Sequence, residues 1–395
     1  MPTDIIVTDT TDGDKNNVDS TTGPDYKIEN DRVIYINKKL ERKVWAHTAV
    51  PGFPLNMLHH DKNSENIQRI LRVCDEKCFN ILFENRNNNF QYEEFLKAAQ
   101  KYKFFCNESN DTTMSLDDMC KLELATLFAH WTQDTGIEFT TGAPAIESWK
   151  NGLFFAYDKD CQHETDKTCM HHDLNDFTYS PYDNQWYWGR GAKRLVGNTN
   201  YGKFSEAFLG DKKALLEHPN RVSEEGWLSF GTSIWFYMTP QSPKPSMHDV
   251  VTKFWKPNNE DLKQDIKEGF GTTIHIISPG ECGYKTKEAQ NRIDYYELFM
   301  NYFNMEILIT DEKSCAFSTP FVYGGEGTMY YHWAFNWTKH YECELVEWQT
   351  EYNLFEMESY ERCIKDYRES NNHTGGPTIP TIPDTDIPMY LFIFL

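Results

Sequence analysis

Apolar residues recur at helical spacing along the central part of the chain. In NSENIQRILRVCDEKCFNILFENRN, which begins at Asn63, they lie three or four positions apart until NRNNN interrupts the pattern. The segments 92–102 and 122–136 show the same spacing, and the second ends on Gly136, a common helix terminator. The apolar stripe of this second segment consists of Leu124, Leu127, Phe128 and Trp131.

Two later segments, 226–238 and 292–303, also carry helical patterns. Near the start of the chain, RVIYIN (32–37) has the short apolar alternation of a strand. We therefore predict a mainly α domain with a minor β component, in the α+β class.

Composition divides the chain into four predicted parts. Residues 1–60 begin with a stretch rich in Asp, Thr and Asn, which is typical of disordered or extended chain. The helical patterns fall within 61–310, the expected globular domain. Residues 311–370 form an extension rich in cysteine and aromatic residues, and 371–395 hold a Thr/Pro linker and a tail.

The formal net charge of −21 restricts the partners. This charge repels nucleic acids and anionic membrane surfaces at long range, so we expect neither a nucleic-acid partner nor membrane insertion. The C-terminal MYLFIFL is much shorter than the roughly 20 apolar residues that a membrane-spanning helix needs. We expect a monomer with a neutral or cationic substrate.

The chain contains ten cysteines and no C-x-x-C pair, a pattern that favours disulfides over a zinc site. Four N-x-S/T sequons, at Asn107, Asn110, Asn336 and Asn372, indicate the same oxidising surroundings. The first 20 residues lack the positive and apolar regions of a signal peptide. We interpret this end as incomplete and predict an extracellular protein.

Three histidines, His163, His171 and His172, lie close to Cys161 and Cys169. Histidine and cysteine are zinc ligands, but a disulfide-closed loop with solvated histidines is the simpler interpretation. We expect no metal site.

One motif is too polar for a core and too aromatic for an ordinary loop. QWYWGRGAKRLVGNTNYG (185–202) combines rings that stack on sugars with arginine and asparagine groups that bond hydroxyls. Its YWGRGAKRLVGNTNYG portion resembles the signature of family 19 chitinases. Three other segments resemble family segments in the right order, so that the resemblance runs from about residue 76 to about residue 308. They begin at Phe79, Ile234 and Gly269.

The resemblance implies a lysozyme-like, mainly helical domain that hydrolyses β-1,4-linked N-acetylglucosamine with inversion and without a cofactor. Inversion uses a general acid and a general base whose carboxyl groups lie roughly 6.5–9.5 Å apart. TQDTG matches the string of the acid and places Asp134 there, while the base position falls on Asp158. Asp160 and Glu164 are alternatives for the base. Both matched positions are glutamates in the family.

Further roles follow from the same resemblance. Glu281 and Arg292 match a charge network that orients the acid, although a structural buried ion pair explains them equally well. Arg194 and Val196 replace a glutamine and a serine that hold sugar and catalytic water, and Ile277 replaces an asparagine. The expected substrate-binding residues are Trp186, Tyr187, Trp188, Arg190, Asn198, Asn200 and Tyr201, with core packing as the alternative for the three aromatic residues at 186–188.

Two main functional hypotheses result. The first is a chitinase-type endo-hydrolase that acts through Asp134 and Asp158 and is slowed by their shorter side chains. The second is a protein that binds chitin or chitooligosaccharides on a catalytically inactive scaffold. A lysozyme-like activity on peptidoglycan is compatible with the scaffold, but no residue favours it.

Overall fold

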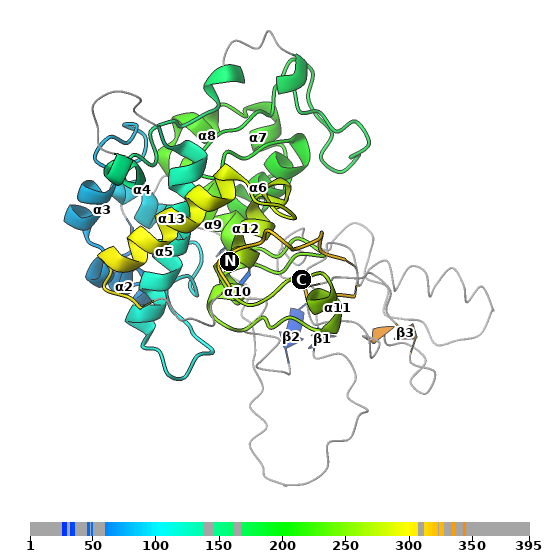
Figure 1. The fold of residues 1–395 in the computed structure, drawn as a ribbon. Helices are drawn as coiled ribbons and strands as arrows, with labels where there is room; N and C mark the ends of the chain where they lie inside the picture. The colour runs from blue at the N-terminus through cyan, green and yellow to red at the C-terminus, as the bar shows by residue number, and fades with distance from the viewer. Residues whose placement is uncertain are drawn as a thin grey trace, which may run out of the picture.

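Helices are the main regular elements of the computed structural model, which is drawn in Figure 1. It describes residues 26–29, 32–35, 46, 47, 49, 60–137, 145–161, 167–306, 312–322, 324–327, 334–335 and 343–344. Among these residues the α-helices are α2 (Glu65–Val73), α3 (Glu76–Leu82), α4 (Tyr92–Ala99), α5 (Leu116–Thr135), α6 (Asn198–Leu209), α7 (Ala214–Glu217), α8 (Arg221–Glu224), α9 (Gly226–Met238), α10 (Met247–Val251), α11 (Asn259–Lys263), α12 (Phe270–Ile277) and α13 (Lys287–Tyr302).

Short 3₁₀ helices and two strand pairs complete the described structure. The 3₁₀ helices are η1 (Ala145–Lys150), η2 (Lys159–Cys161), η3 (Lys167–Cys169) and η4 (Pro279–Glu281). Strand β1 (Tyr26–Glu29) pairs antiparallel with β2 (Arg32–Tyr35), and β3 (Ala334–Phe335) pairs antiparallel with β4 (Cys343–Glu344). The prediction of a mainly helical fold is confirmed.

The helical pattern that begins at Asn63 forms two helices instead of one. The side chain of Asp75 accepts a hydrogen bond from the backbone N–H of Cys78, so it caps a new helix directly after α2. A disulfide between Cys74 and Cys78 spans the break. The apolar spacing continues through the break because each helix has its own buried apolar residues, Ile67 and Ile70 in α2 and Phe79 and Leu82 in α3.

Helix α5 occupies the centre of the domain. Most of its residues are buried, and it packs against α2, α10, α12 and above all α13, which lies beside it in Figure 1. Its predicted stripe is fully buried, and the Trp131 ring contacts the rings of Phe95, Phe128 and Phe230. This aromatic core fixes the position of the last turn of α5.

Gly136 ends α5, as predicted, but for a steric reason. Its backbone is extended rather than left-handed, and its N–H donates to the carbonyl of Thr132. A Cβ atom at this position would lie 2.3 Å from that same carbonyl oxygen. The chain can therefore turn sharply after residue 135 only with glycine there.

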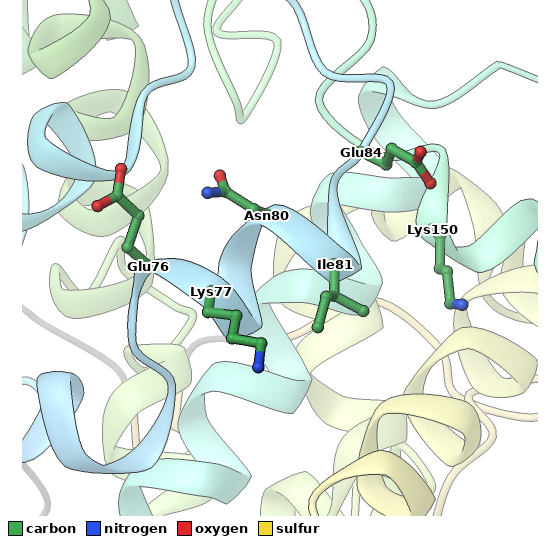
Figure 2. A pocket seen from close by; sticks show the side chains of 6 residues that line it. All are labelled: Glu76, Lys77, Asn80, Ile81, Glu84 and Lys150. Carbon is green, nitrogen blue, oxygen red and sulfur yellow. The ribbon is translucent and has the colours of Figure 1, made fainter.

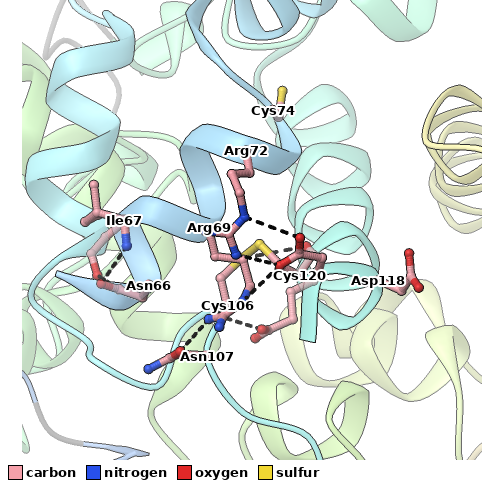
Figure 3. Close-up of a disulfide and its surroundings, with 12 residues drawn as sticks. Asn66, Ile67, Arg69, Arg72, Cys74, Cys106, Asn107, Asp118 and Cys120 are labelled. Carbon is pink, nitrogen blue, oxygen red and sulfur yellow. Dashed lines mark hydrogen bonds and ion pairs between the residues drawn. A yellow bond between two sulfur atoms is a disulfide. The ribbon is translucent and has the colours of Figure 1, made fainter. Parts of the chain in front are cut away.

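Disulfides join neighbouring elements throughout the described residues. Figure 3 shows one of them, where Arg69 of α2 donates to the Cys106 carbonyl and the Cys106 N–H donates to Glu123 of α5. The described bridges are Cys74–Cys78, Cys106–Cys120, Cys161–Cys169 and Cys282–Cys315. Cys343 lies in β4 and Cys363 lies outside the described residues. No helix in the described ranges has the length and apolar character needed to cross a membrane.

Candidate active site

The carboxylate of Asp134 lies in the last turn of α5, beside α13. Arg292 of α13 donates from Nη2 to Asp134 Oδ1 at 2.5 Å. The other oxygen, Oδ2, is shielded from solvent and has no hydrogen-bond partner among the described residues. One oxygen of this carboxylate is therefore held by a cation, and the other is unengaged.

Arg292 joins Asp134 to a second carboxylate. Its guanidinium donates to Glu281 from Nε at 2.8 Å and from Nη2 at 2.9 Å, a bidentate contact, and Nη2 also donates to Ser278 Oγ at 3.0 Å. Burial alone would lower the pKa of Arg292, but the charge of Asp134 and the bonds to Glu281 raise it. The guanidinium stays charged and holds both carboxylates in one network.

The position of Glu281 is fixed by the residues before it and after it in the chain. Glu281 ends η4, which follows α12 directly, and the next residue, Cys282, is bridged to Cys315. The hydroxyl of Ser278, the residue just before η4, adds an acceptor for Arg292. Ile277, in place of the expected asparagine, is buried.

A second cation, Lys193, lies close enough to interact with this network. Burial lowers the pKa of Lys193, whereas the charge of Asp134 opposes that shift. Its ammonium lies 4.6 Å from the centroid of the Phe236 ring. Lys193 comes from the 187–202 signature loop, so this loop contributes a positive charge beside Asp134.

Asp158 belongs to a segment that lies between α5 and the signature loop. On one side, Phe155 N–H donates to the carbonyl of Thr135, the last residue of α5, at 2.9 Å. On the other side, Gly191 N–H donates to the Ala156 carbonyl at 2.8 Å, and Asp158 N–H donates to the Gly189 carbonyl at 2.7 Å. The two candidate carboxylates therefore lie on segments that are joined directly by a backbone hydrogen bond.

Arg194 forms an ion pair with Asp158. Its Nη2 lies 3.2 Å from Asp158 Oδ1, and both side chains are about one-third exposed, at 33% each. This arginine stands where the resemblance implies a glutamine. Val196, where the resemblance implies a serine, is exposed, and its side chain offers no hydrogen bond.

The signature loop is built around a buried arginine. Arg190 Nη1 donates to the carbonyl of Trp186 at 2.8 Å and to Tyr201 Oη at 3.0 Å, and Nη2 donates to Asn220 at 2.7 Å. Its guanidinium lies over the Trp188 ring, 3.8 Å from the centroid. At Gly191, where φ is +76°, a Cβ atom would meet Thr232 Oγ1 at 2.7 Å, so only glycine fits.

Most of the predicted sugar-binding side chains are structural in this geometry. Four of them have no exposed surface, so they shape the loop and do not face a ligand; these are Tyr187, Arg190, Asn198 and Tyr201. Trp188 is 5% exposed and packs against the Cys161–Cys169 disulfide. Trp186 and Asn200 are partly exposed and can reach a ligand. Substrate binding by the seven residues stays a prediction, and Trp186 and Asn200 are those among them whose side chains are accessible for direct contact.

Asn198 fastens a neighbouring loop to the first turn of α6. Its amide accepts from Asp173 N–H at 2.6 Å and donates to the carbonyls of Asp173 and Tyr179 at 3.1 Å and 2.8 Å. The loop between these anchors exposes Leu174 and Phe177 to solvent. Asn198 therefore positions a surface loop and lies beneath it.

The other candidates from the sequence lie apart from this network. Asp160 is exposed, and its N–H donates to Asp158 Oδ1 at 3.2 Å. His163 and Glu164 lie outside the described residues. His171 is exposed, and His172 Nε2 lies 2.6 Å from the carbonyl of Gln185. The described residues contain no group of three or more potential metal ligands.

A separate surface pocket of about 540 Å³ is shown in Figure 2. Side chains of α3, the residue after its C-cap and the last residue of η1 line it. They are Glu76, Lys77, Asn80, Ile81, Glu84 and Lys150. Neither Asp134 nor Asp158 belongs to this pocket.

Three members of the network were not predicted from the sequence: His130, Lys193 and Ser278. His130 Nδ1 lies 3.2 Å from Arg292 Nη1. Its spacing of four residues before Asp134 places both side chains on one face of α5, and this signal was available in the sequence. No pattern in the neighbouring sequence predicts that Lys193 or Ser278 lies close to Arg292.

Comparison with known families and proteins gives a consistent result. The family model described as Chitinase class I matches residues 69–313. Endochitinase A2 of Pisum sativum is 30% identical over 256 residues, which cover 62% of this chain and 71% of that protein. Chitinase 11 of Oryza sativa subsp. japonica is 32% identical over 239 residues, which cover 60% of this chain and 79% of that protein.

Solved structures give matches of similar extent. Chitinase C from Streptomyces griseus HUT6037 is 22% identical, with a TM-score of 0.46, and the match covers 62% of this chain and 97% of that chain. A Family GH19, Class IV chitinase from Zea mays is 19% identical, with a TM-score of 0.44, and the match covers 64% and 100%.

Proposed function

The chain belongs to the chitinase class I family of glycoside hydrolases, and from this premise we propose that it is an inverting endo-hydrolase of chitin. The observation that carries this proposal is the contact of Arg292 with both Asp134 and Glu281. A buried guanidinium that links two carboxylates, one of them at the end of a central helix, supports an active-site network.

In the proposed reaction, Asp134 is the general acid and Asp158 is the general base. Asp134 donates its proton to the glycosidic oxygen as the bond from that oxygen to C1 breaks. Asp158 removes a proton from the water whose oxygen forms the new bond to C1 from the opposite face. Because Oδ1 of Asp134 is bound to Arg292, we assign the proton transfer to Oδ2, which is shielded from solvent in this structure and has to be reached by the glycosidic oxygen for this step.

The surrounding cations then have a defined role. When Asp134 has lost its proton, Arg292 and Lys193 stabilise the resulting carboxylate. Glu281 holds Arg292 in place through its bidentate contact. No step requires a metal or a cofactor, since two carboxylates and water suffice for this chemistry.

We expect slow turnover. Aspartate in place of glutamate withdraws each carboxyl group by about 1.5 Å, the length of one carbon–carbon bond. A displacement of about 1 Å can lower a rate by on the order of 10²-fold. Val196 in addition gives the catalytic water no hydrogen bond.

A second candidate function is binding of chitin without cleavage. It is favoured by the ion pair of Arg194 with Asp158 and by the shielding of Asp134 Oδ2. The first feature engages Asp158 Oδ1 and the second hides Asp134 Oδ2, so each makes one carboxylate oxygen less available for a reaction. Neither feature affects the partly exposed side chains of Trp186 and Asn200, which can still bind a ligand.

The two functions separate in one experiment. Purified protein is incubated with chitohexaose and the reducing ends are quantified for the parent chain, Asp134→Asn and Asp158→Asn, with Asp160→Asn as a matched control at an exposed neighbouring carboxylate. Hydrolysis that is lost in the first two variants and kept in the control supports the enzyme. Intact hexaose with a folded protein retained on a chitin column supports binding alone.

We also propose that the protein works outside the cell. The disulfides among the described residues support this, because such bridges persist in oxidising compartments. Thiol titration of the protein purified from culture medium checks the proposal: we expect no thiol reaction from these cysteines. Protein retained inside the cell with reduced cysteines contradicts it.

A further inference from the structure

His130 lies behind Arg292, one helical turn before Asp134. It is fully buried in α5, and its ring stacks on Phe270 with centroids 5.1 Å apart and planes at 12°. Phe270 in turn stacks on Tyr296 of α13 at 4.1 Å. The plane of the imidazole is therefore set by Phe270 of α12, which is itself backed by Tyr296 of α13.

The hydrogen bonds around this ring determine which nitrogen carries its proton. Arg292 Nη1 lies 3.2 Å from Nδ1, and because a guanidinium only donates, Nδ1 must accept. The remaining proton is then on Nε2, which donates to Thr273 Oγ1 at 3.0 Å. The Thr273 hydroxyl donates onward to the Phe270 carbonyl at 2.7 Å. Every donor in this chain meets an acceptor.

The charges that face His130 favour the same state. Burial lowers the pKa of His130, and the charges of Arg292 and Lys193 lower it further. A proton on Nδ1 would point at the donating N–H of Arg292. The ring is thus a neutral acceptor throughout the physiological range.

We propose that His130 is a positioning residue which, as the neutral Nε2-protonated tautomer, fixes Arg292 and through it the carboxylate of Asp134. Arg292 and Thr273 together set the tautomer, and Phe270 sets the ring plane. The effect on turnover rests on the proposed function. The tautomer and the contact with Arg292 do not.

The tautomer is tested by NMR on the full chain with ¹⁵N-labelled histidine, with the signals of His130 assigned by their loss in His130→Gln. We expect a pyrrole-type Nε2 and a pyridine-type Nδ1 that do not change between about pH 5 and 8, where free histidine titrates. A proton on Nδ1, or titration to imidazolium in this range, overturns the proposal.

The positioning role is tested by two variants of similar volume. Glutamine can accept from Arg292 and donate to Thr273, whereas leucine can do neither. We expect His130→Gln to keep kcat within a few-fold and His130→Leu to lower kcat by roughly 10- to 100-fold with little change in KM. Full activity in folded His130→Leu, or equal losses in both variants, contradicts the role.

A second pair of variants and the NMR measurement keep the proposal testable if His130→Leu does not fold or the parent chain is inactive. If His130→Leu does not fold, Thr273→Val takes its place with Thr273→Ser as the matched control, and the same contrast in kcat is expected. If the parent chain cleaves no chitohexaose, the proposed function fails. The NMR measurement then still decides whether His130 holds Arg292 in the stated tautomer.

Discussion

Arg292 and Arg194 each bind one of the two proposed catalytic carboxylates, in different surroundings. The pair of Arg292 with Asp134 is buried, and removing one member of such a pair typically costs about 3–5 kcal/mol. The pair of Arg194 with Asp158 is about one-third exposed, and such pairs contribute only about 0.2–1 kcal/mol. Breaking the first contact is therefore much the more costly, while the second can open at little cost when a substrate arrives.

Replacing Arg194 with glutamine should increase turnover. The substitution removes the ion pair of Asp158 Oδ1, which among the described residues then keeps only its bond from the Asp160 N–H and is a better acceptor for the attacking water. Because the exposed pair is worth at most about 1 kcal/mol, we expect kcat on chitohexaose to rise by up to about fivefold. Arg194→Lys is the control, since it retains a cation. A fall in kcat in Arg194→Gln would show that the arginine assists the reaction.

The sequence predicts the contacts and burial of some residues of the site better than those of others. The contact of Glu281 with Arg292 was expected under both interpretations of the sequence, because a buried arginine needs a carboxylate. The burial of Arg190 and Asn198 was not expected. Their polar groups bind backbone carbonyls from other segments, and these partners are visible only after the chain has folded.

At the scale of elements, α5 and α13 form the frame of the site. They contribute Asp134 and Arg292, and their packing brings these residues together although 158 positions separate them in the chain. The segment 151–158 and the signature loop then join this frame by backbone bonds at Thr135, Ala156 and Gly189. The position of each carboxylate thus depends on main-chain pairing and not on side-chain contacts alone.

Asn198→Ala should loosen the loop that spans Asp173 to Tyr179. The buried amide makes three hydrogen bonds to that loop, and alanine would leave their backbone partners unsatisfied. We expect the free energy of unfolding to fall by about 1–3 kcal/mol in urea titrations. Asn200→Ala is the control, because that partly exposed amide makes a single bond to the Val196 carbonyl. Equal effects of the two variants would contradict this assignment.

The sequence predicts the elements best where one apolar face decides the structure. The predicted segment 226–238 coincides with α9, because apolar residues dominate it from end to end. Helix α6 was missed, since its first turn lies inside the polar signature and begins after Gly197. The break between α2 and α3 was also missed. It depends on a cap at Asp75, which leaves no mark on apolar spacing.

At the scale of the whole molecule, a second buried polar network lies apart from the proposed site. His248 is held between Glu123, 2.6 Å from Nδ1, and Glu108, 2.7 Å from Nε2. Burial alone would lower the pKa of His248, but the charges and hydrogen bonds of the two glutamates raise it to about 9. This cluster links α5 and α10 to the loop that precedes α5.

The His248 network should make global stability depend on pH. A pKa raised above the ordinary value of about 6.5 means that its contribution is complete below about pH 6.5 and is lost as the pH rises through about 9. We expect the difference in unfolding free energy between the parent chain and His248→Gln to shrink from about pH 7 to about pH 10. A difference that is constant or grows over this range would show that His248 is not charged in the folded state.

The central claim, that Asp134 and Asp158 act as an inverting pair, is tested most directly by the anomeric form of the first product. Chitohexaose is cleaved by the parent chain and the products are resolved by NMR before mutarotation sets in. Because the substrate linkage is β, inversion yields the α-anomer first, and this is the result we expect, with no product from Asp134→Asn. Appearance of the β-anomer first, or the same products from Asp134→Asn, would contradict the account.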